Sequence, residues 1–279
     1  MTRTRSRSFT RLGQPALVLL LLLLLIAVPF WLVLSTSGKP LDEALNPNLD
    51  PPSTWQLAEN YSEAATKGEI WLALLGSVTI VVPAVLIVLI LGAMAAWVFA
   101  RRSGRMAAAL YAVGISGVLI PPAAVTLVVV LRQLGLAGTS AGLIGVYSGM
   151  YLSLVIFFIT GFVRTVPIEL EEAARVDGAG PVKVFFRIIL PLLSPVMATS
   201  AILVTLFAWN DVFYAFFVLG GGNVSTIPLN LFKVANTALY TNAWNLIFAY
   251  VVLASVPLVA LFAVAQRRII SGVTSGAVK

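Results

Sequence analysis

Six long apolar segments constrain the fold of this chain more than any other feature of its sequence. An α-helix rises about 1.5 Å per residue, so roughly 20 apolar residues cross the hydrocarbon core of a bilayer. Lipid cannot hydrogen-bond to unpaired backbone N–H and C=O groups, and we therefore expect these segments to be helices. The sequence predicts an all-α integral membrane protein, with one transmembrane domain over residues 1–279. The spans are expected at about residues 17–35, 72–100, 107–131, 141–163, 189–219 and 246–265.

The composition also limits the chemistry of the chain. Hydrophobic residues make up 59% and charged residues 10%, whereas soluble domains are about 25% charged. The chain has no cysteine and no histidine, so thiolate chemistry and the commonest general base and metal ligand are excluded. Residues 138–142 and 114–117 match serine-hydrolase patterns but lack that base. We expect no catalytic and no metal site.

The basic residues predict an orientation in the membrane. Four of the 18 lysines and arginines (Lys39, Lys67, Arg132 and Lys233) fall in one set of connections, and the other 14 fall in the opposite set. The positive-inside rule then places both termini, the tail 1–14 and the loop 164–188 in the cytoplasm. The first segment could instead be a secretory signal peptide. Its apolar run of about 20 residues exceeds the roughly 7–15 of a signal peptide, so we expect a retained helix.

The loop 164–188 contains a spaced pattern. Acidic residues near its start and two alanines favour a short helix, and Gly178 can adopt positive φ and turn the chain. We predict a helix–turn–helix at the membrane surface, with a flat patch suited to docking. An ordinary amphipathic loop is the alternative. The pattern is Glu172-Ala173-Ala174, three residues, Gly178, nine residues, Ile188, one residue, then Leu190-Pro191.

This pattern resembles the EAA loop of permease subunits of bacterial ABC importers, E-A-A-x3-G-x9-I-x-L-P, at all seven fixed positions. Asp177-Gly178-Ala179, Trp209-Asn210-Asp211 and Thr226-x-Pro228-Leu229 resemble the carbohydrate-importer branch. The resemblance is closest to the smaller, six-span permease of the maltose type and covers nearly the whole chain. The stretch Ser37-Gly38-Lys39-Pro40 is a departure, because that family more often has a leucine before the lysine.

The resemblance implies the type I permease fold of ABC importers, with the loop as a coupling helix seated on a cytoplasmic ATPase. Glu172 would pair with a basic group there, and Ala173, Ala174 and Gly178 would permit close approach. Asp177, Ile188, Leu190 and Pro191 complete the coupling set.

The resemblance also implies a set of partners and a location. The partners are a second homologous permease, two ATPase subunits carrying ATP and Mg²⁺, and a substrate-binding protein facing residues 223–245. A sugar substrate, surrounding lipid and the bacterial cytoplasmic (inner) membrane complete the expectation. The chain itself would need no cofactor, catalyse no reaction and bind no nucleic acid.

Asp211 is the one charged residue within the predicted spans. Such a residue is costly in lipid and is expected to face a cavity or a partner. With Trp209, Asn210 and Tyr214 it could line a path for a polyhydroxylated solute. Alternatively, Asn210 and Asp211 cap or hydrogen-bond within the helix bundle.

Two other functions stay open at this point. An ion-coupled secondary transporter would need several buried carboxylates or broken helices. An ABC permease could also carry a sugar phosphate or a polyol.

Overall fold

The computed structural model describes residues 6–120, 122–220, 222–239 and 242–277, and every regular element in these ranges is a helix. The predicted all-α class is confirmed. The chain divides into two compact units. The first contains residues up to 70 together with 231–256, and the second contains 71–230 together with residues from 257 onward.

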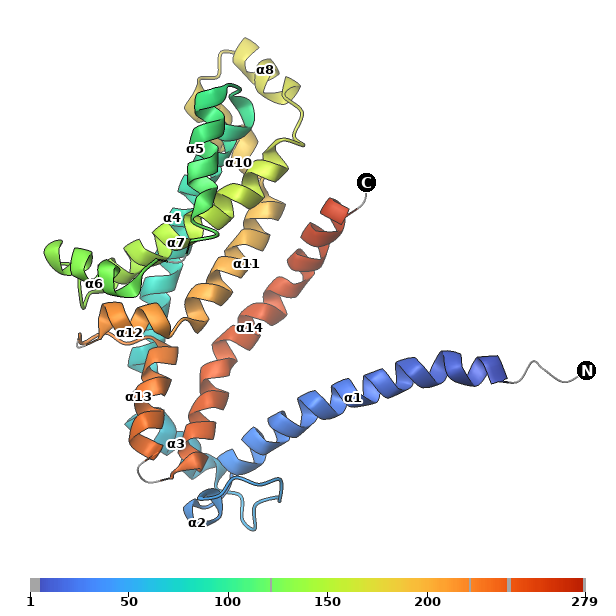
Figure 1. Ribbon diagram of the computed structural model, residues 1–279, viewed down its shortest axis with the longest axis vertical. Coiled ribbons are helices and arrows are strands. Elements are labelled where there is room, and N and C mark those ends of the chain that lie inside the picture. The colour runs from blue at the N-terminus through green and yellow to red at the C-terminus, as the bar shows by residue number, and fades with distance from the viewer. Residues whose placement is uncertain (1–5, 121, 221, 240–241, 278–279) are drawn as a thin grey trace, which may run out of the picture. The chain divides into compact units, whose positions relative to one another are not determined.

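The first unit is held together around a buried amide. Asn60 donates hydrogen bonds from Nδ2 to the carbonyl oxygens of Ser37 and Lys39, both at 2.9 Å, and accepts one from Asn245 Nδ2 at 3.1 Å. These bonds fix the chain after α1 onto α3 and α14. The helices that contribute to this unit are α1 (Ser6–Ser37), α2 (Leu41–Ala44), α3 (Leu57–Lys67), α13 (Ile227–Leu239) and α14 (Trp244–Ala277) (Figure 1).

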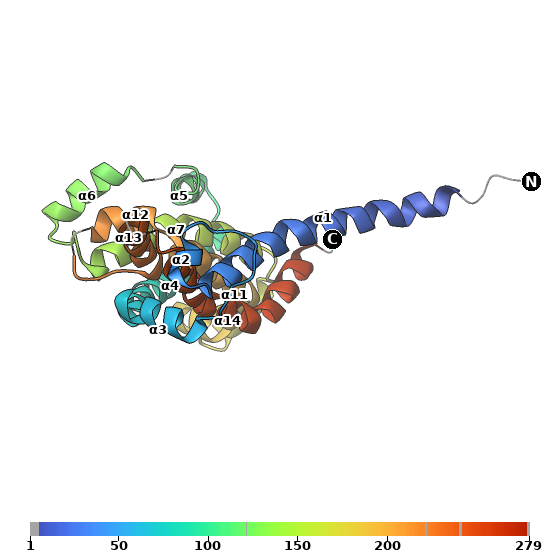
Figure 2. The ribbon, with the colours of Figure 1, turned by 90° about the horizontal axis from the view of Figure 1, so that it is seen from below.

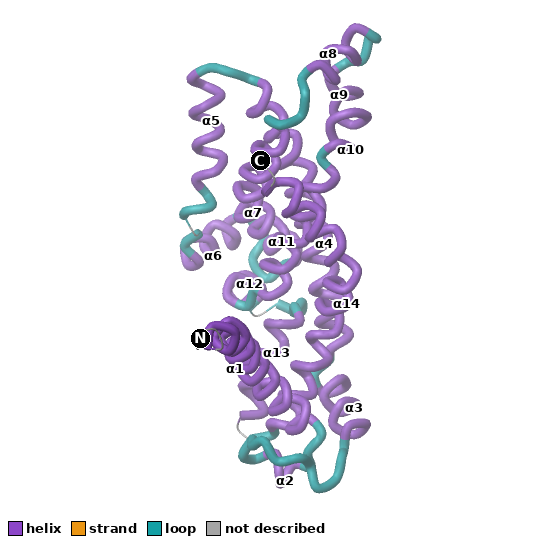
Figure 3. The backbone as a smooth tube through the Cα atoms, turned by 90° about the vertical axis from the view of Figure 1, so that its right-hand side faces the viewer, coloured by secondary structure: helices purple, strands orange, loops and turns teal. Residues whose placement is uncertain are grey.

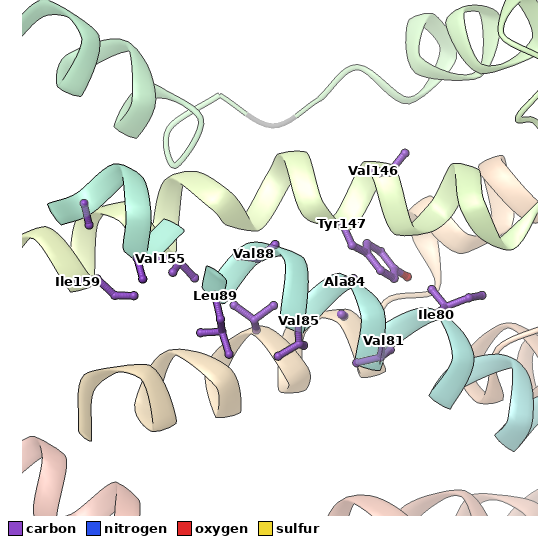
Figure 4. Packing of buried hydrophobic residues seen from close by; sticks show 14 of the residues in the cluster. Ile80, Val81, Ala84, Val85, Val88, Leu89, Val146, Tyr147, Val155 and Ile159 are labelled. Carbon is purple, nitrogen blue, oxygen red and sulfur yellow. The ribbon is translucent and has the colours of Figure 1, made fainter. Parts of the chain in front are cut away.

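The second unit is built on close contact between α4 and α7. Small buried residues on α4 lie against α7, and Ala84 and Val88 face the Tyr147 and Val155 side of that helix (Figure 4). A Cβ placed on Gly92 would lie only 2.6 Å from the Val155 side chain, so the helices approach as closely as small residues allow. The helices of this unit are α4 (Ile70–Arg101), α5 (Arg105–Ser116), α6 (Ala124–Gln133), α7 (Ser140–Val163), α8 (Glu169–Val176), α9 (Pro181–Val184), the π-helical turn η1 (Phe185–Ile189), α10 (Leu190–Leu192), α11 (Ser194–Asn210) and α12 (Phe213–Leu219), together with parts of α13 and α14.

Four helices in the described ranges are long and apolar enough to cross a membrane, and a bent pair gives a fifth. The four are α1, α4, α7 and α14, which correspond to the first, second, fourth and sixth expected spans. Helix α1 begins at Ser6, so it runs into the segment that we expected as a tail. Helices α3 and α13 lie in the connections that follow the first and the fifth expected spans.

The third expected span, 107–131, is not one helix. It consists of α5 and α6, and in Figure 2 α5 is seen end-on whereas α6 runs across the view. Turn hydrogen bonds from the amides of Val118 and Leu119 end α5. The sequence Pro121-Pro122 follows, and proline has no N–H with which to continue a helix. The apolar side chains of residues 107–131 indicate a segment buried in lipid, but they do not show that the backbone N–H needed to continue the helix is missing.

The fifth expected span, 189–219, is also interrupted. Helical structure already starts at Pro181, passes through η1 and bends by 74° between Leu192 and Ser194. The π-helical turn η1 ends two residues before Pro191. A proline ring within a helix clashes with the carbonyl four residues earlier, and the wider π turn relieves that clash. A second break at Asp211 and Val212 separates α11 from α12.

Candidate functional site

The loop between α7 and α11 folds as the predicted helix, turn and helix, at one end of the second unit (Figure 3). Gly178 has a φ of +81°. Its amide donates to the carbonyl of Arg175 at 3.0 Å, and the Ala179 amide donates to that of Ala174 at 2.9 Å. This pair of bonds is a Schellman motif, which requires a left-handed residue after the helix. The glycine that ends α8 is therefore required by backbone geometry.

One face of α8 points into the protein. The Glu171 side chain is 1% exposed and accepts hydrogen bonds from Arg101 Nε at 2.6 Å and Trp97 Nε1 at 3.0 Å. Arg101 also donates from Nη2 to the carbonyl of Val166 at 2.8 Å. Arg175, one turn further along α8, also pairs with Glu171, at a longer distance of 3.8 Å. A buried, fully partnered carboxylate thus fastens α8 to the end of α4.

The opposite face of α8 is open. Glu172 and Ala173 are exposed, and Val176 is 87% exposed. Beyond the turn, Val182 is 70% exposed. Exposed apolar side chains in the same short loop as an exposed acidic residue are typical of an interaction surface. We call Glu172, Ala173, Val176 and Val182 the outer face of the loop.

The remaining residues of the EAA-like pattern are divided between the two sides. Asp177 is exposed, whereas Ala174 is buried on the inward side. Ile188 and Leu190 pack against the hydrophobic core. The second half of the pattern therefore anchors the loop to the fifth apolar segment, and Pro191 remains exposed.

Asp211 lies at the break between α11 and α12. Its carboxylate accepts a hydrogen bond from the Tyr147 hydroxyl at 2.9 Å and others from the amides of Ala215 at 3.0 Å and Tyr214 at 3.3 Å. The Tyr214 hydroxyl donates to the carbonyl of Pro122 at 3.0 Å. The alternative in which Asp211 caps a helix and bonds within the bundle is what the structure shows.

The other path candidates point in different directions. Trp209 lines an apolar cavity of about 300 Å³ between α4, α11 and the part of α14 after Pro257. Asn210 is exposed, and its Nδ2 donates to the carbonyl of Leu206 at 2.8 Å. Phe207, one turn earlier and 51% exposed, stacks on Tyr151 of α7. The four predicted residues therefore do not converge on one site. In the part of the chain that the structure describes, acidic residues form no cluster suited to a metal ion.

Comparison with known proteins identifies the family. The family model described as "Binding-protein-dependent transport system inner membrane component" matches residues 88–275. The chain belongs to this family. The prediction of a permease subunit of an ATP-binding-cassette importer is confirmed, and the chain is a multi-pass inner-membrane protein that works with ATPase and substrate-binding subunits.

Named relatives align with the permease over most of its length. It is 35% identical to the melibiose/raffinose/stachyose import permease protein MelC of Bacillus subtilis, over 90% of this chain and 91% of that one. It is 33% identical to the diacetylchitobiose uptake system permease protein NgcG of Streptomyces coelicolor, over 93% of this chain and 86% of that one. A crystal structure of a bacterial ABC transporter involved in the import of the acidic polysaccharide alginate matches with a TM-score of 0.77, covering 95% of this chain and 99% of that one. At 20% identity it supports the fold alone.

The sequence did not reveal which residues of the permease hold α8. Trp97 and Arg101 are one helical turn apart at the end of α4, and Phe185 packs on Trp97 with ring centroids 5.6 Å apart. A tryptophan and an arginine closing an apolar segment are common at a membrane interface. Their partner, Glu171, is 70 residues away from Arg101 along the chain and can be found only once the helices are packed.

Proposed function

We propose that the permease forms half of a translocation path for a sugar, which it exposes alternately to the two sides of the membrane. The relatives named for melibiose, raffinose and stachyose and for diacetylchitobiose support a sugar cargo. A sugar phosphate would need cationic groups in the path, and none of the six expected spans contains lysine or arginine. That composition favours an uncharged solute.

The proposal includes the assembly around the permease. A second homologous permease would supply the other half of the path, and two ATPase subunits would hold ATP and Mg²⁺. The substrate-binding protein would face residues 223–245. The 14 basic residues of one set of connections support cytoplasmic termini, and with that orientation α8 would lie on the side of the ATPases.

The single observation that carries the coupling proposal is that α8 has two faces. The outer face would seat on an ATPase subunit, with Glu172 paired to a basic group there. The inner face binds Arg101 of α4 through buried Glu171. A displacement of α8 by the ATPase would therefore move the end of α4 with it, because a buried charge separates from its partner only at high cost.

Among the path candidates, Asn210 is the best candidate for contact with the solute. A polar side chain exposed on a membrane helix is expected to face a cavity or a partner, and Asn210 is exposed on α11. The other three candidates would shape the path indirectly. Trp209 lines an apolar cavity, and Asp211 and Tyr214 are hydrogen-bonded within the protein. The Asn210→Ala variant should weaken uptake affinity while leaving assembly intact. Unchanged uptake would remove Asn210 from the path.

The experiment that tests the coupling is co-purification. The chain is tagged, expressed with the genes that neighbour its own, extracted in detergent and analysed for bound subunits. We expect a second permease and an ATPase, with the ATPase lost in Glu172→Lys. The matched control is Asp50→Lys, an equal charge reversal in the connection before α3. Retention of the ATPase by Glu172→Lys, or its loss from the control as well, would contradict the role of the outer face.

The cargo is tested separately in vesicles that contain the whole complex and the binding protein. ATP-driven uptake of labelled oligosaccharides is compared with uptake of a polyol and a sugar phosphate. Preference for the oligosaccharide supports the proposal, and preference for either of the other solutes overturns the sugar assignment without affecting the coupling result.

A further inference from the structure

The first unit contains a cavity of about 620 Å³ between α3, α13 and the start of α14, three helices that lie together in Figures 1 and 3. Its volume is within the range of small-molecule sites, which combine apolar walls with a few placed polar groups. The walls include Leu41, Val234 and Leu246, and Asn60 and Asn245 also line the cavity.

Two opposite charges line this cavity without an ion-pair partner. Glu63 and Lys67 of α3 pair with each other at 2.5 Å. Glu59 of α3 and Lys233 of α13 also line the cavity, and within the described residues neither forms a salt bridge. The cavity thus presents one free carboxylate and one free ammonium, which together match a ligand carrying both signs of charge.

The acidic side of the cavity selects for a hydrogen-bond donor. A carboxylate accepts hydrogen bonds and donates none, so Glu59 favours a cation that carries N–H groups. Asn245 Oδ1, by contrast, has almost no accessible surface and offers the ligand no acceptor.

The cavity lies where apolar helices begin. Helix α3 ends at Lys67, three residues before α4 starts, and α14 starts at Trp244. Trp244 belongs to the same unit as the cavity. Tryptophans at the ends of spans mark the headgroup level of a bilayer. Apolar walls with a charged rim at this depth suit a lipid rather than a freely soluble molecule.

We propose that this cavity binds the headgroup of a phospholipid that carries a primary ammonium and a phosphate, as phosphatidylethanolamine does. The ammonium donates to the Glu59 carboxylate, the phosphate lies at Lys233, and the glycerol and upper acyl chains follow the apolar wall. A choline headgroup has no N–H to donate to Glu59. An anionic headgroup without an amine leaves Glu59 unpaired.

The test uses the full chain, purified with the subunits that accompany it. Native mass spectrometry measures retention of phosphatidylethanolamine, phosphatidylcholine and phosphatidylglycerol added in equal amounts. We expect the ethanolamine lipid to be preferred by about fivefold, the scale of one exposed ion pair. Glu59→Gln and Lys233→Gln should each abolish the preference, while Asp50→Asn, a carboxylate of the same unit that does not line the cavity, should keep it.

A series that needs no variant covers the case in which a substitution disturbs folding. Retention by the unaltered protein should fall as the amine is methylated stepwise to choline. Equal retention of all headgroups, or a preference for phosphatidylglycerol, would overturn the proposal. Competition by soluble glycerophosphoethanolamine at the same concentration would reassign the cavity to a free solute. These readouts do not involve cargo or ATP hydrolysis, so they stand apart from the test of the proposed function.

Discussion

Replacement of Arg101 by alanine tests whether the buried carboxylate holds α8 to α4. Glu171 is 1% exposed, and Arg101 is its nearest charged partner, with Nε at 2.6 Å. The substitution also removes the bond from Arg101 to the Val166 carbonyl. The carboxylate would then remain buried with Trp97 as its one close donor and Arg175 at 3.8 Å.

The expected cost follows from this geometry. Breaking a buried ion pair by removal of one partner costs about 3–5 kcal/mol. The Arg101 side chain is 16% exposed, so water can enter in its place, and Arg175 can move closer. We therefore expect the lower end of this range. The substitution should lower the free energy of local opening of the loop by about 3 kcal/mol, rather than the free energy of global unfolding.

Hydrogen exchange measures that opening directly. A loss of about 3 kcal/mol raises the exchange rate of amides that exchange by local opening by about a hundredfold. The amides of residues 171–179 should show this increase in the detergent-purified complex. In the same complex, ATP hydrolysis should continue while solute-coupled transport falls, because under the coupling proposal α8 would no longer move α4.

Arg102→Ala is the matched control. Arg102 is the next residue, is exposed and makes no salt bridge among the described residues. It should leave exchange in the loop within about twofold of the unaltered protein, as surface substitutions usually change stability by less than about 0.5 kcal/mol. Equal exchange in the two variants would refute the argument that Glu171 fastens the loop through Arg101.

Two further predictions concern the turn and the broken helix. Gly178→Ala should destabilise the loop by about 1–2 kcal/mol, because its φ of +81° is strained for any residue with a Cβ. Gly180→Ala, at a φ of −69°, should be nearly neutral, and thermal unfolding of the two variants separates them. Tyr147→Phe should cost about 1.5–3 kcal/mol through loss of its bond to the Asp211 carboxylate. Tyr151→Phe should cost less, since no described residue hydrogen-bonds its hydroxyl, and equal melting temperatures would contradict the role given to Tyr147.

The sequence was sufficient where a local rule determines the structure. The long apolar segments indicate helices because lipid leaves the backbone no other partner. Gly178 was predictable because a left-handed position after a short helix selects glycine, and the structure has it at that position. Both inferences depend only on neighbouring residues.

The sequence was insufficient where the backbone breaks within an apolar run. Hydropathy measures how apolar the side chains are and not whether the backbone continues as a helix. It therefore does not detect the separation of α5 from α6 or the 74° bend before α11. The signals were Pro121-Pro122 and Ser194-Pro195, since prolines remove donors from the helix ladder. Asp211 was a third signal, for which a solute contact and a cap within the bundle were both left open, and its carboxylate accepts hydrogen bonds from the first amides of α12.

Glu171 and Asp211, two carboxylates that each accept several hydrogen bonds, have the same structural role. Each is a carboxylate that fixes a short helix, α8 or α12, to a long one, α4 or α7. A carboxylate away from water is tolerated when donors surround it, and those donors come from helices far apart in the chain. Because α4 and α7 also pack closely on each other, α8 and α12 are tied to one block. The 74° bend before α11 lies outside these two attachments, so under the coupling proposal it is the place where the helices bend when α8 is moved.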